Sequence, residues 1–479
     1  MPADVPSSFG DCAEPAQRLK TDGGAHRLPL AAAVRAFGQR MLRMWGRETF
    51  LHARLINIGH LLAGSFFGSI IGMVAFVVTA RALGPADYGL LALAYSYGRA
   101  VHLLVGFQSW QPLIKYGAEL QEAGRHDDYR SLLKFGLLLD VAAAVIAFLV
   151  AVGLALAFGP LVGVSEEAML LVLIYSSTLL FQINGFPTAV MRLAGRFWVV
   201  AYGSQFNTVL RLVLCLIGLL TGAQLLYFVI VWTVTQIVGS LVILVLAFIE
   251  IRRQGVDHLL SAPLSGISTR FKGLWTFTIG SNIELTVRSS ASQFDTLIVG
   301  ALAGPAAAGF YHIAKRLGRV VVQCGVQVQA VLYPDVARLW ARMEVASFRR
   351  TVLQMEILLI TFGVAVVAAT WLGIQPLLRW TAGPEFMAAA PLATVQMVAV
   401  AMTLSGSAVR TALLAMGRQP AILKIVLGAT IVFHITALTA IPIMGAMGAN
   451  IAHIAMSSVW LAALMLVYHK ALKDHPNPA

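Results

Sequence analysis

The sequence predicts an all-α protein that crosses a membrane about twelve times, in two parallel six-helix repeats that form two lobes around a central cavity. The first observation behind this prediction is composition: 58% of the residues are hydrophobic, 12% are charged, and the mean hydropathy is +0.78. The second is the recurrence of apolar stretches of about 18 or more residues, which is the length that spans a bilayer. The third is an internal duplication with an offset of 220 residues.

Twelve apolar spans set the predicted domain boundaries. They lie at 55–80, 88–110, 135–158, 168–190, 197–220, 225–249, 273–301, 309–333, 352–374, 387–409, 421–441 and 447–469. Backbone groups in lipid must pair internally, and the alternation of a closed barrel is missing, so the spans are predicted to be helices. The domains expected are a cytoplasmic N-terminal arm at 1–54, an N-lobe at 55–249, a linker at 250–272, a C-lobe at 273–469 and a cytoplasmic tail at 470–479.

The N-terminal arm divides into two parts. Its first part is rich in Pro, Gly, Ala and Asp and is expected to be disordered. Residues 30–45 alternate apolar and Arg positions at helical spacing, which is typical of a basic amphipathic helix on an anionic membrane surface. A solvated basic arm is the alternative.

A hairpin motif around Gly304-Pro305 occurs twice in the chain. Seven residues match identical residues 220 positions later: Gly84, Pro85, Ala86, Gly89, Gly98, Arg99 and Val101. With the offset drifting to 222, Gly195-Arg196 matches Gly417-Arg418. Matches at one offset across a whole hairpin indicate two homologous halves. Six spans per half give both halves the same orientation, about an axis along the membrane normal.

The loop charges predict the orientation. Of 35 Lys and Arg residues, 27 lie in the two terminal segments and the even-numbered loops, whereas the opposite side carries only Arg81 and Arg379. By the positive-inside rule, both termini are cytoplasmic. The net charge of +13 therefore needs no nucleic acid as partner. The three cysteines are far apart, so neither a disulfide framework nor a metal site is suggested, and no cofactor is expected.

Charged residues inside the spans are the candidate functional residues. The bases are Arg99, Arg211, Arg288, Lys315, Arg316 and Arg319, and the acids are Glu284 and Asp295. Each would cost about 2.5–3.5 kcal/mol if it faced lipid, so they are expected to face protein or water. Two interpretations stay open. The acids could neutralise neighbouring bases in a salt-bridge core, or the excess of bases could line a cavity for an anion.

Other polar residues in the spans carry weaker signals. Asp140 and Glu356 lie near the cytoplasmic ends of the third and ninth spans, where a solvated or locally paired carboxylate is expected. Histidines are scattered over five spans and are interpreted as helix contacts rather than a proton relay.

A family resemblance rests on these residues. The stretch DTLIVGALAGPAAAGFYHIAKRL at 295–317 resembles the seventh and eighth helices of the bacterial polysaccharide-transport flippases, in the superfamily that also holds the MATE multidrug exporters and the lipid II flippase. The segment ARALGPADYGL at 80–90, the Tyr333-Pro334 exit and the AGR turn at 194–196 are similar to the same family's pattern. The long basic N-terminal arm departs from that pattern.

The resemblance implies a MATE-like fold and a function. It implies export of an undecaprenyl-pyrophosphate-linked oligosaccharide across the bacterial inner membrane by alternating access, with membrane lipids and polysaccharide polymerase or assembly proteins as further partners. The six intramembrane bases would contact the substrate, and Glu284 and Asp295 are candidates for coupling to H⁺ or Na⁺. Arg99 and Arg319, equivalent by the repeat, are expected to face each other across the cleft.

Three other functions fit the sequence less well. A cation-coupled drug exporter of the same fold should line its cavity with acids and aromatics, whereas this cavity is expected to be basic. A membrane glycan polymerase or ligase should carry a large outer loop, whereas the outer loops here have at most about a dozen residues. A scaffold role leaves the intramembrane charges unexplained.

Overall fold

The computed structural model describes residues 49–107, 109–159, 165–203, 205–256, 258–271 and 273–474. Residues Asn57–Ala479 form one compact unit, and every contact described below lies within that unit. The amphipathic helix predicted at 30–45 lies outside the described residues. Within the described ranges the regular elements are helices, and no strand occurs.

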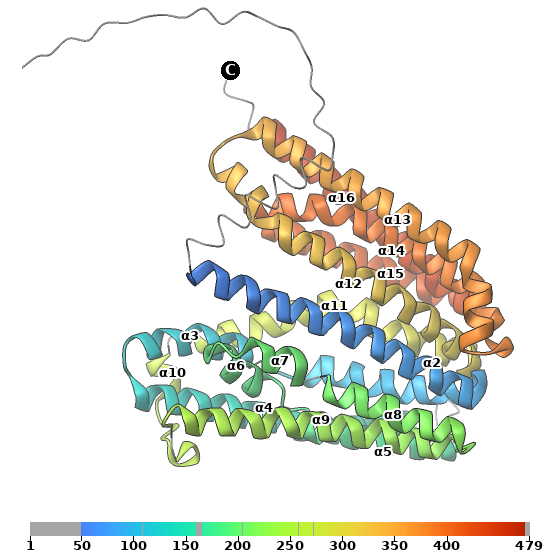
Figure 1. The fold of residues 1–479 in the computed structure, drawn as a ribbon, viewed down its shortest axis with the longest axis horizontal. Coiled ribbons are helices and arrows are strands. Elements are labelled where there is room, and N and C mark those ends of the chain that lie inside the picture. Colours follow the sequence, from blue (N-terminus) through green and yellow to red (C-terminus); the bar gives the residue numbers. More distant parts are fainter. Residues whose placement is uncertain are drawn as a thin grey trace, which may run out of the picture. The chain divides into compact units, whose positions relative to one another are not determined.

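The first half of the chain supplies the helices of the N-lobe (Figure 1). They are α2 (Thr49–Val105), α3 (Trp110–Glu122), α4 (His126–Phe158), α5 (Glu166–Ser176), η2 (Ser177–Phe181), α6 (Gly185–Leu193), α7 (Phe197–Gly203), α8 (Phe206–Leu220) and α9 (Leu225–Arg253). The fourth predicted span is not one continuous helix, because α5, η2 and α6 follow one another across a break at residues 182–184.

The second half supplies the helices of the C-lobe, after a linker that contains η3 (Leu259–Ser261) and α10 (Ile267–Arg270). They are α11 (Leu274–Ala303), α12 (Pro305–Ala341), α13 (Val345–Thr381), η4 (Pro384–Ala388), α14 (Ala389–Ala415), α15 (Gln419–Met444) and α16 (Ala446–Lys473).

The predicted spans coincide with these helices. Nine helical segments in the described part of the chain are long and apolar enough to cross a membrane. Three further spans complete the predicted twelve. Gly84 divides α2 into two arms, each of which is a span, and α11 and α12 are long enough to span the membrane although charges interrupt them. Large apolar side chains point outward, including Leu220 and Ile443, each 84% exposed. A water-soluble protein rarely exposes so much apolar surface, so the fold is that of a polytopic membrane protein.

The duplicated Gly-Pro motif has the same backbone conformation in both halves. Gly84 has φ 72° and ψ 175°, and Gly304 has φ 86° and ψ 171°. A positive φ of this kind is favourable for glycine alone, and the proline that follows starts the next helix without losing a hydrogen bond. Each motif therefore ends one helix and begins the next within two residues.

The two Gly-Pro turns pack directly against each other. A Cβ on Gly89 would overlap the carbonyl oxygen of Pro305, and a Cβ on Gly309 would lie 2.5 Å from the carbonyl oxygen of Pro85. The contact is thus reciprocal between the halves, as a pseudo-two-fold axis requires.

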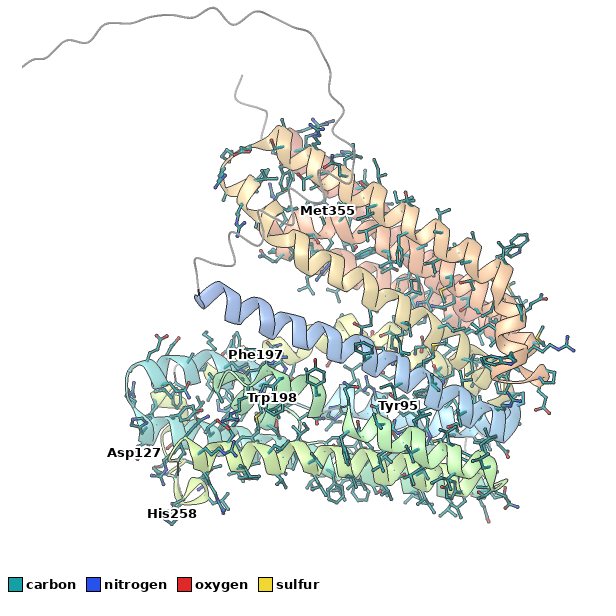
Figure 2. The ribbon with its side chains drawn as sticks, viewed as in Figure 1. Tyr95, Asp127, Phe197, Trp198, His258 and Met355 are labelled. Atoms are coloured by element: carbon teal, nitrogen blue, oxygen red, sulfur yellow. The ribbon has the colours of Figure 1, made fainter. Side chains whose placement is uncertain are left out.

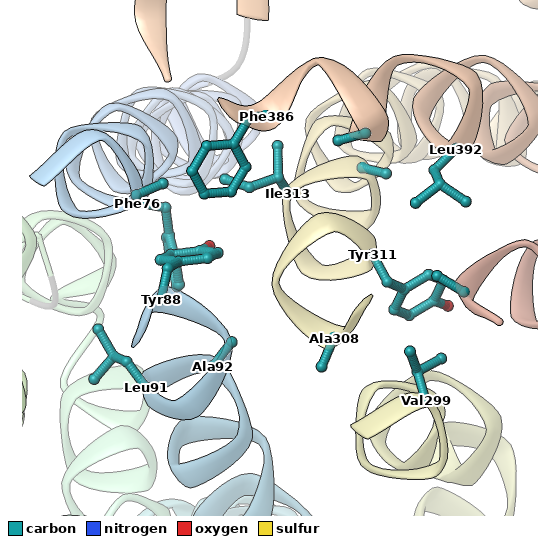
Figure 3. Close-up of a cluster of buried hydrophobic side chains, with 14 of the residues drawn as sticks. Phe76, Tyr88, Leu91, Ala92, Val299, Ala308, Tyr311, Ile313, Phe386 and Leu392 are labelled. Carbon is teal, nitrogen blue, oxygen red and sulfur yellow. The ribbon is translucent and has the colours of Figure 1, made fainter. Parts of the chain in front are cut away.

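Polar and aromatic contacts between the lobes surround these turns. The Tyr88 hydroxyl lies 2.7 Å from Nδ1 of His312, and the Tyr88 ring meets Phe386 edge to face (Figure 3). Arg81 donates from Nη1 to the carbonyl oxygen of Trp380, at 2.7 Å, near the last turn of α13. The lobes are therefore joined at this end.

The hydrophobic clusters also show that the lobes are joined near the Gly-Pro turns and separate towards the other end. One cluster is shared by the lobes near the Gly-Pro turns and includes Phe76, Tyr88, Trp232, Val299, Tyr311 and Phe386. Towards the other end the N-lobe has a cluster of its own around Leu133 and Phe186, and the C-lobe has one around Phe348 and Leu413. Leu274, in the first turn of α11, packs in the N-lobe cluster, so α11 contacts both lobes.

The repeat is also visible in the loops at this second end. Gly195 and Gly417 both have positive φ, at 70° and 73°. The arginine after each glycine forms an ion pair near the end of its own lobe: Arg196 with Glu250 at 2.6 Å, and Arg418 with Asp474 at 3.8 Å. The sequence match at these positions therefore reflects a shared structural role.

Gly89→Ala should keep the lobes from closing at the Gly-Pro turns, because the added methyl group collides with backbone rather than with a flexible side chain. Spin labels at Asp87 and Leu302, both exposed, should report a longer distance by electron–electron double resonance. Gly428→Ala is the matched control, since its Cβ meets no atom within 4 Å. An unchanged distance in Gly89→Ala would show that this packing does not hold the lobes together.

Candidate functional site

The basic residues predicted for the site lie on four helices. Arg99 is on the second arm of α2, Arg211 on α8, Arg288 on α11, and Lys315, Arg316 and Arg319 on α12. The side chains of Arg288 and Glu284 lie outside the described ones, so their proposed roles stay predictions. The remaining five bases fall into three environments: paired with a carboxylate, stacked on an aromatic ring, or without an ion pair or hydrogen bond among the described side chains.

Lys315 is held in a hydrogen-bonded network within the C-lobe. Its Nζ lies 2.5 Å from Oδ1 of Asp295 and donates to the carbonyl oxygen of Ser292 at 2.6 Å. Asp295 is fully buried. Its Oδ2 accepts from the Tyr311 hydroxyl at 2.8 Å and lies 3.1 Å from Nε2 of His453, on α16. Lys315 is therefore neutralised by a carboxylate of its own lobe, as in the salt-bridge interpretation.

Arg316, the next residue, points across the lobe boundary. Its guanidinium lies over the ring of Phe76, 3.9 Å from the centroid, and Phe76 belongs to the first arm of α2. Cation–π stacking stabilises a desolvated guanidinium without neutralising its charge. No carboxylate pairs with Arg316 among the described side chains.

Arg211 is buried in the N-lobe and is satisfied by neutral groups. It donates from Nε to the Thr235 hydroxyl at 3.0 Å and from Nη2 to Oε1 of Gln236 at 3.2 Å. Its guanidinium lies over the ring of Trp232, 4.6 Å from the centroid. Trp232 in turn packs on Phe76 with ring centroids 4.3 Å apart. Arg211 is thus a buried member of an arginine–aromatic stack and does not snorkel to the membrane surface.

Tyr95 lies near four of these bases, and the sequence alone did not single it out. It is on the second arm of α2 and is labelled in Figure 2. Its ring packs edge to face on Trp232 at 5.5 Å. Its hydroxyl feels the electrostatic field of four guanidiniums, those of Arg99, Arg211, Arg316 and Arg319. Its position one helical turn before Arg99 is the signal that could have identified it.

Arg99 and Arg319 have no ion pair or hydrogen bond among the described side chains. Arg99 is exposed and lines a pocket of about 270 Å³ between α2 and α11. Arg319 is half-buried and is not part of that lining. The two guanidiniums come from different lobes and both act on Tyr95, but their facing each other across the cleft stays a prediction.

The wall of the pocket opposite Arg99 is a neutral polar stripe on α11. Its members recur at helical spacing and share one face: Asn282, Thr286, Ser289 and Gln293. Thr286 also donates to the carbonyl oxygen of Leu103, at 3.0 Å, which ties α11 to α2. A base facing amides and hydroxyls can bind an anionic group together with neutral hydroxyl groups.

Comparison with known proteins shows what this chain is similar to. The pattern of the family described as polysaccharide biosynthesis protein matches residues 55–340. Inner membrane protein YghQ of Escherichia coli (strain K12) is 23% identical over 350 residues, which cover 73% of this chain and 98% of YghQ.

Solved structures of transporters share the fold. The inward-facing conformation of a multidrug resistance MATE family transporter of the MOP superfamily aligns with a TM-score of 0.65 at 13% identity, over 85% of this chain and 94% of that one. Lipid II flippase MurJ in an inward closed conformation also aligns at 0.65 and 13%, over 85% of this chain and 86% of that one. The predicted MATE-like two-lobe fold is confirmed.

Lys315→Met should lower the free energy of unfolding by about 3–5 kcal/mol, because Asp295 would remain buried without its cation. The double variant Lys315→Met/Asp295→Asn should recover most of this loss. Arg316→Met is the matched control one residue away, and it should lose only a cation–π contact, about 0.5–2 kcal/mol. Thermal unfolding of the purified variants in detergent measures the difference. Equal losses for Lys315→Met and Arg316→Met would contradict the division between the two bases.

Proposed function

Because the chain belongs to the polysaccharide biosynthesis protein family, we propose that it is a flippase for a polyprenyl-pyrophosphate-linked oligosaccharide. It moves the substrate from the cytoplasmic to the periplasmic leaflet of the bacterial inner membrane, for surface or exopolysaccharide synthesis. It acts as a transporter and not as an enzyme. The fold-level support is the match to the family pattern and the likeness to MurJ and MATE structures.

The observation that carries the proposal is the unneutralised positive charge where the lobes meet. Arg99, Arg316 and Arg319 lie near Tyr95 without a carboxylate partner among the described side chains. Unpaired cations in a protein that faces lipid cost several kcal/mol unless water or an anion reaches them. A pyrophosphate offers several charged oxygens, and guanidiniums bind such oxygens with paired hydrogen bonds. Lys315 is left out of this contact set, because Asp295 already holds it.

The neutral stripe on α11 complements this charge. Sugars present hydroxyl groups, which amide and hydroxyl side chains such as Asn282 and Gln293 can both donate to and accept from. The pocket between Arg99 and the stripe is large enough for a polar head group but not for a polyprenyl chain, which is expected to stay in the bilayer.

Alternating access fits the way the lobes are joined. They share a hydrophobic cluster near the Gly-Pro turns and have separate clusters towards the other end. With both termini cytoplasmic, the joined end is periplasmic and the site faces the cytoplasm, where the substrate is loaded.

Two rival functions receive less support. A cation-coupled drug exporter would need acidic groups in its cavity, but Asp295 is fully buried in its own network. A glycan polymerase or ligase would need a large outer loop, and the α2 arms and the pair α11 and α12 are joined by single Gly-Pro turns. Polymerase or assembly proteins are proposed as partners rather than as activities of this chain.

Cysteines introduced at Ala86 and Leu302 test the orientation, in a background without the three native cysteines. Both positions flank the Gly-Pro turns and are exposed. They should react with an impermeant maleimide added to cells whose outer membrane alone is permeable. A cysteine at Asp127, exposed in the first turn of α4, should react only after the inner membrane is opened. The reverse pattern would overturn the proposed direction of transport.

Arg99→Gln, Arg316→Gln and Arg319→Gln should each reduce glycan export while leaving protein abundance near normal. Loss of one charged contact to a phosphate costs about 1.5–3 kcal/mol, which corresponds to a roughly ten- to hundredfold weaker affinity. Arg342→Gln, at an exposed helix end, is the matched control and should export normally. Export is measured as translocation of a lipid-linked oligosaccharide in proteoliposomes. Normal rates in all three variants would reject the proposed substrate site.

A further inference from the structure

A second buried carboxylate, Asp140 of α4, lies in an environment unlike that of Asp295. Its position near the end of the third span predicted solvation or a local pair, but the residue is only 3% exposed. Its Oδ2 accepts from the backbone N–H of Phe186 at 2.7 Å, and its Oδ1 has no hydrogen-bond partner. Burying an ionised carboxylate with so few donors is costly.

The carboxylate lies at the break in the fourth span. Phe186 is the second residue of α6, the helix that starts after the interruption at residues 182–184. The first N–H groups of a helix are unpaired and carry partial positive charge, which favours an ionised carboxylate there. Broken helices in secondary transporters are places where coupling ions bind.

A second unpartnered group completes the site. Ser109, just before α3, is 1% exposed, and its Oγ also has no hydrogen-bond partner. Its hydroxyl and the backbone N–H of Gly185, the first residue of α6, are close enough to stabilise the ionised Asp140 carboxylate. Both side chains border Gly185: a Cβ there would overlap Ser109 Oγ and would lie 2.9 Å from each carboxylate oxygen. Two unsatisfied oxygens therefore meet around one glycine, with no room for a larger ligand.

No cation forms an ion pair with Asp140 among the described side chains. The charged and titratable groups on elements packed against α4 are Tyr97, Arg99 and His102 on the second arm of α2, Lys115, Tyr116, Glu119 and Glu122 on α3, Glu166, Glu167 and Tyr175 on α5, Arg192 on α6, His258 before η3 and Arg270 on α10. None pairs with Asp140. Lys115 lies over Phe277, and Arg192 lies over Trp110.

We propose that Asp140 is a proton-binding carboxylate of the N-lobe. In the neutral form, its Oδ1–H donates to Ser109 Oγ, which satisfies both unpartnered oxygens at once. In the ionised form, the proton has left to water, and the carboxylate is stabilised by the Ser109 hydroxyl and by the N–H groups of Gly185 and Phe186 at the start of α6. A proton needs no cavity, in agreement with the close packing around Gly185.

The site is connected to the candidate substrate pocket through the chain. Gly106 and His102 line that pocket, and Ser109 follows Gly106 by three residues. A change in the direction of the hydrogen bond between Asp140 and Ser109 therefore acts on the junction between α2 and α3. Proton binding at Asp140 can therefore affect the residues that line the pocket. Its role in driving transport rests on the proposed function, whereas proton binding itself does not.

Infrared difference spectroscopy of the protein in nanodiscs tests the proposal without any glycan. A pH step should produce the band of a protonated carboxylic acid in the wild type, and Asp140→Asn should lose it. The double variant Lys315→Met/Asp295→Asn, which removes the buried Asp295 carboxylate with its cation, should keep it. A band of unchanged size in Asp140→Asn would overturn the proposal.

Ser109→Ala gives an independent readout that keeps the carboxylate. Because the Ser109 hydroxyl stabilises the ionised carboxylate, its loss should make the band appear already at less acidic pH. An unchanged titration, or a shift to more acidic pH, would overturn the role assigned to Ser109. Loss of glycan export in proteoliposomes plays no part in these outcomes, so a failure of the proposed function can be told apart from a failure of this site.

Discussion

The close packing of the two Gly-Pro turns is the constraint on which the rest of the structure depends. Gly89 meets the backbone of Pro305, and Gly309 meets the backbone of Pro85. Backbone-to-backbone contact of this kind leaves no room for side chains to adjust. It fixes the register of one half against the other, and with it the heights at which the charges of α2, α11 and α12 come together.

Given that register, the structure separates two kinds of intramembrane charge. Asp295 and Lys315 form a self-sufficient pair that belongs to the C-lobe alone. Arg316 lies on an aromatic ring of the opposite lobe, and Arg99 is exposed in a pocket between the lobes. The first arrangement stabilises a lobe, whereas the second depends on how the lobes sit together and on what lies between them. Only the second can respond to a substrate.

Much of the fold could be predicted from the sequence, because its determinants are local. Length and hydropathy define the helices, and the repeated Gly-Pro motif defines two turns that indeed share one backbone conformation. The environments of the candidate residues could not be predicted in the same way. A helical wheel places Lys315 and Arg316 on one arc, but their partners lie on other helices. Lys315 forms a salt bridge with Asp295, whereas Arg316, one residue later, lies over the ring of Phe76. The burial of Asp140 was missed because it depends on a break in a neighbouring helix that hydropathy does not reveal.

The contact between Arg81 and the end of α13 affects how fast the two lobes can separate at the Gly-Pro turns. Its acceptors are the carbonyl oxygens of Trp380 and Thr381, which have no partner further along the helix, and Arg81 itself is exposed. Water can replace a guanidinium at such oxygens, so the exchange costs only about 0.5–1.5 kcal/mol per hydrogen bond. Hydration of this helix end can therefore proceed one bond at a time. Water can therefore replace these hydrogen bonds in succession. The barrier to separating the lobes at this end is set by the apolar cluster beneath it rather than by the polar contacts of Arg81.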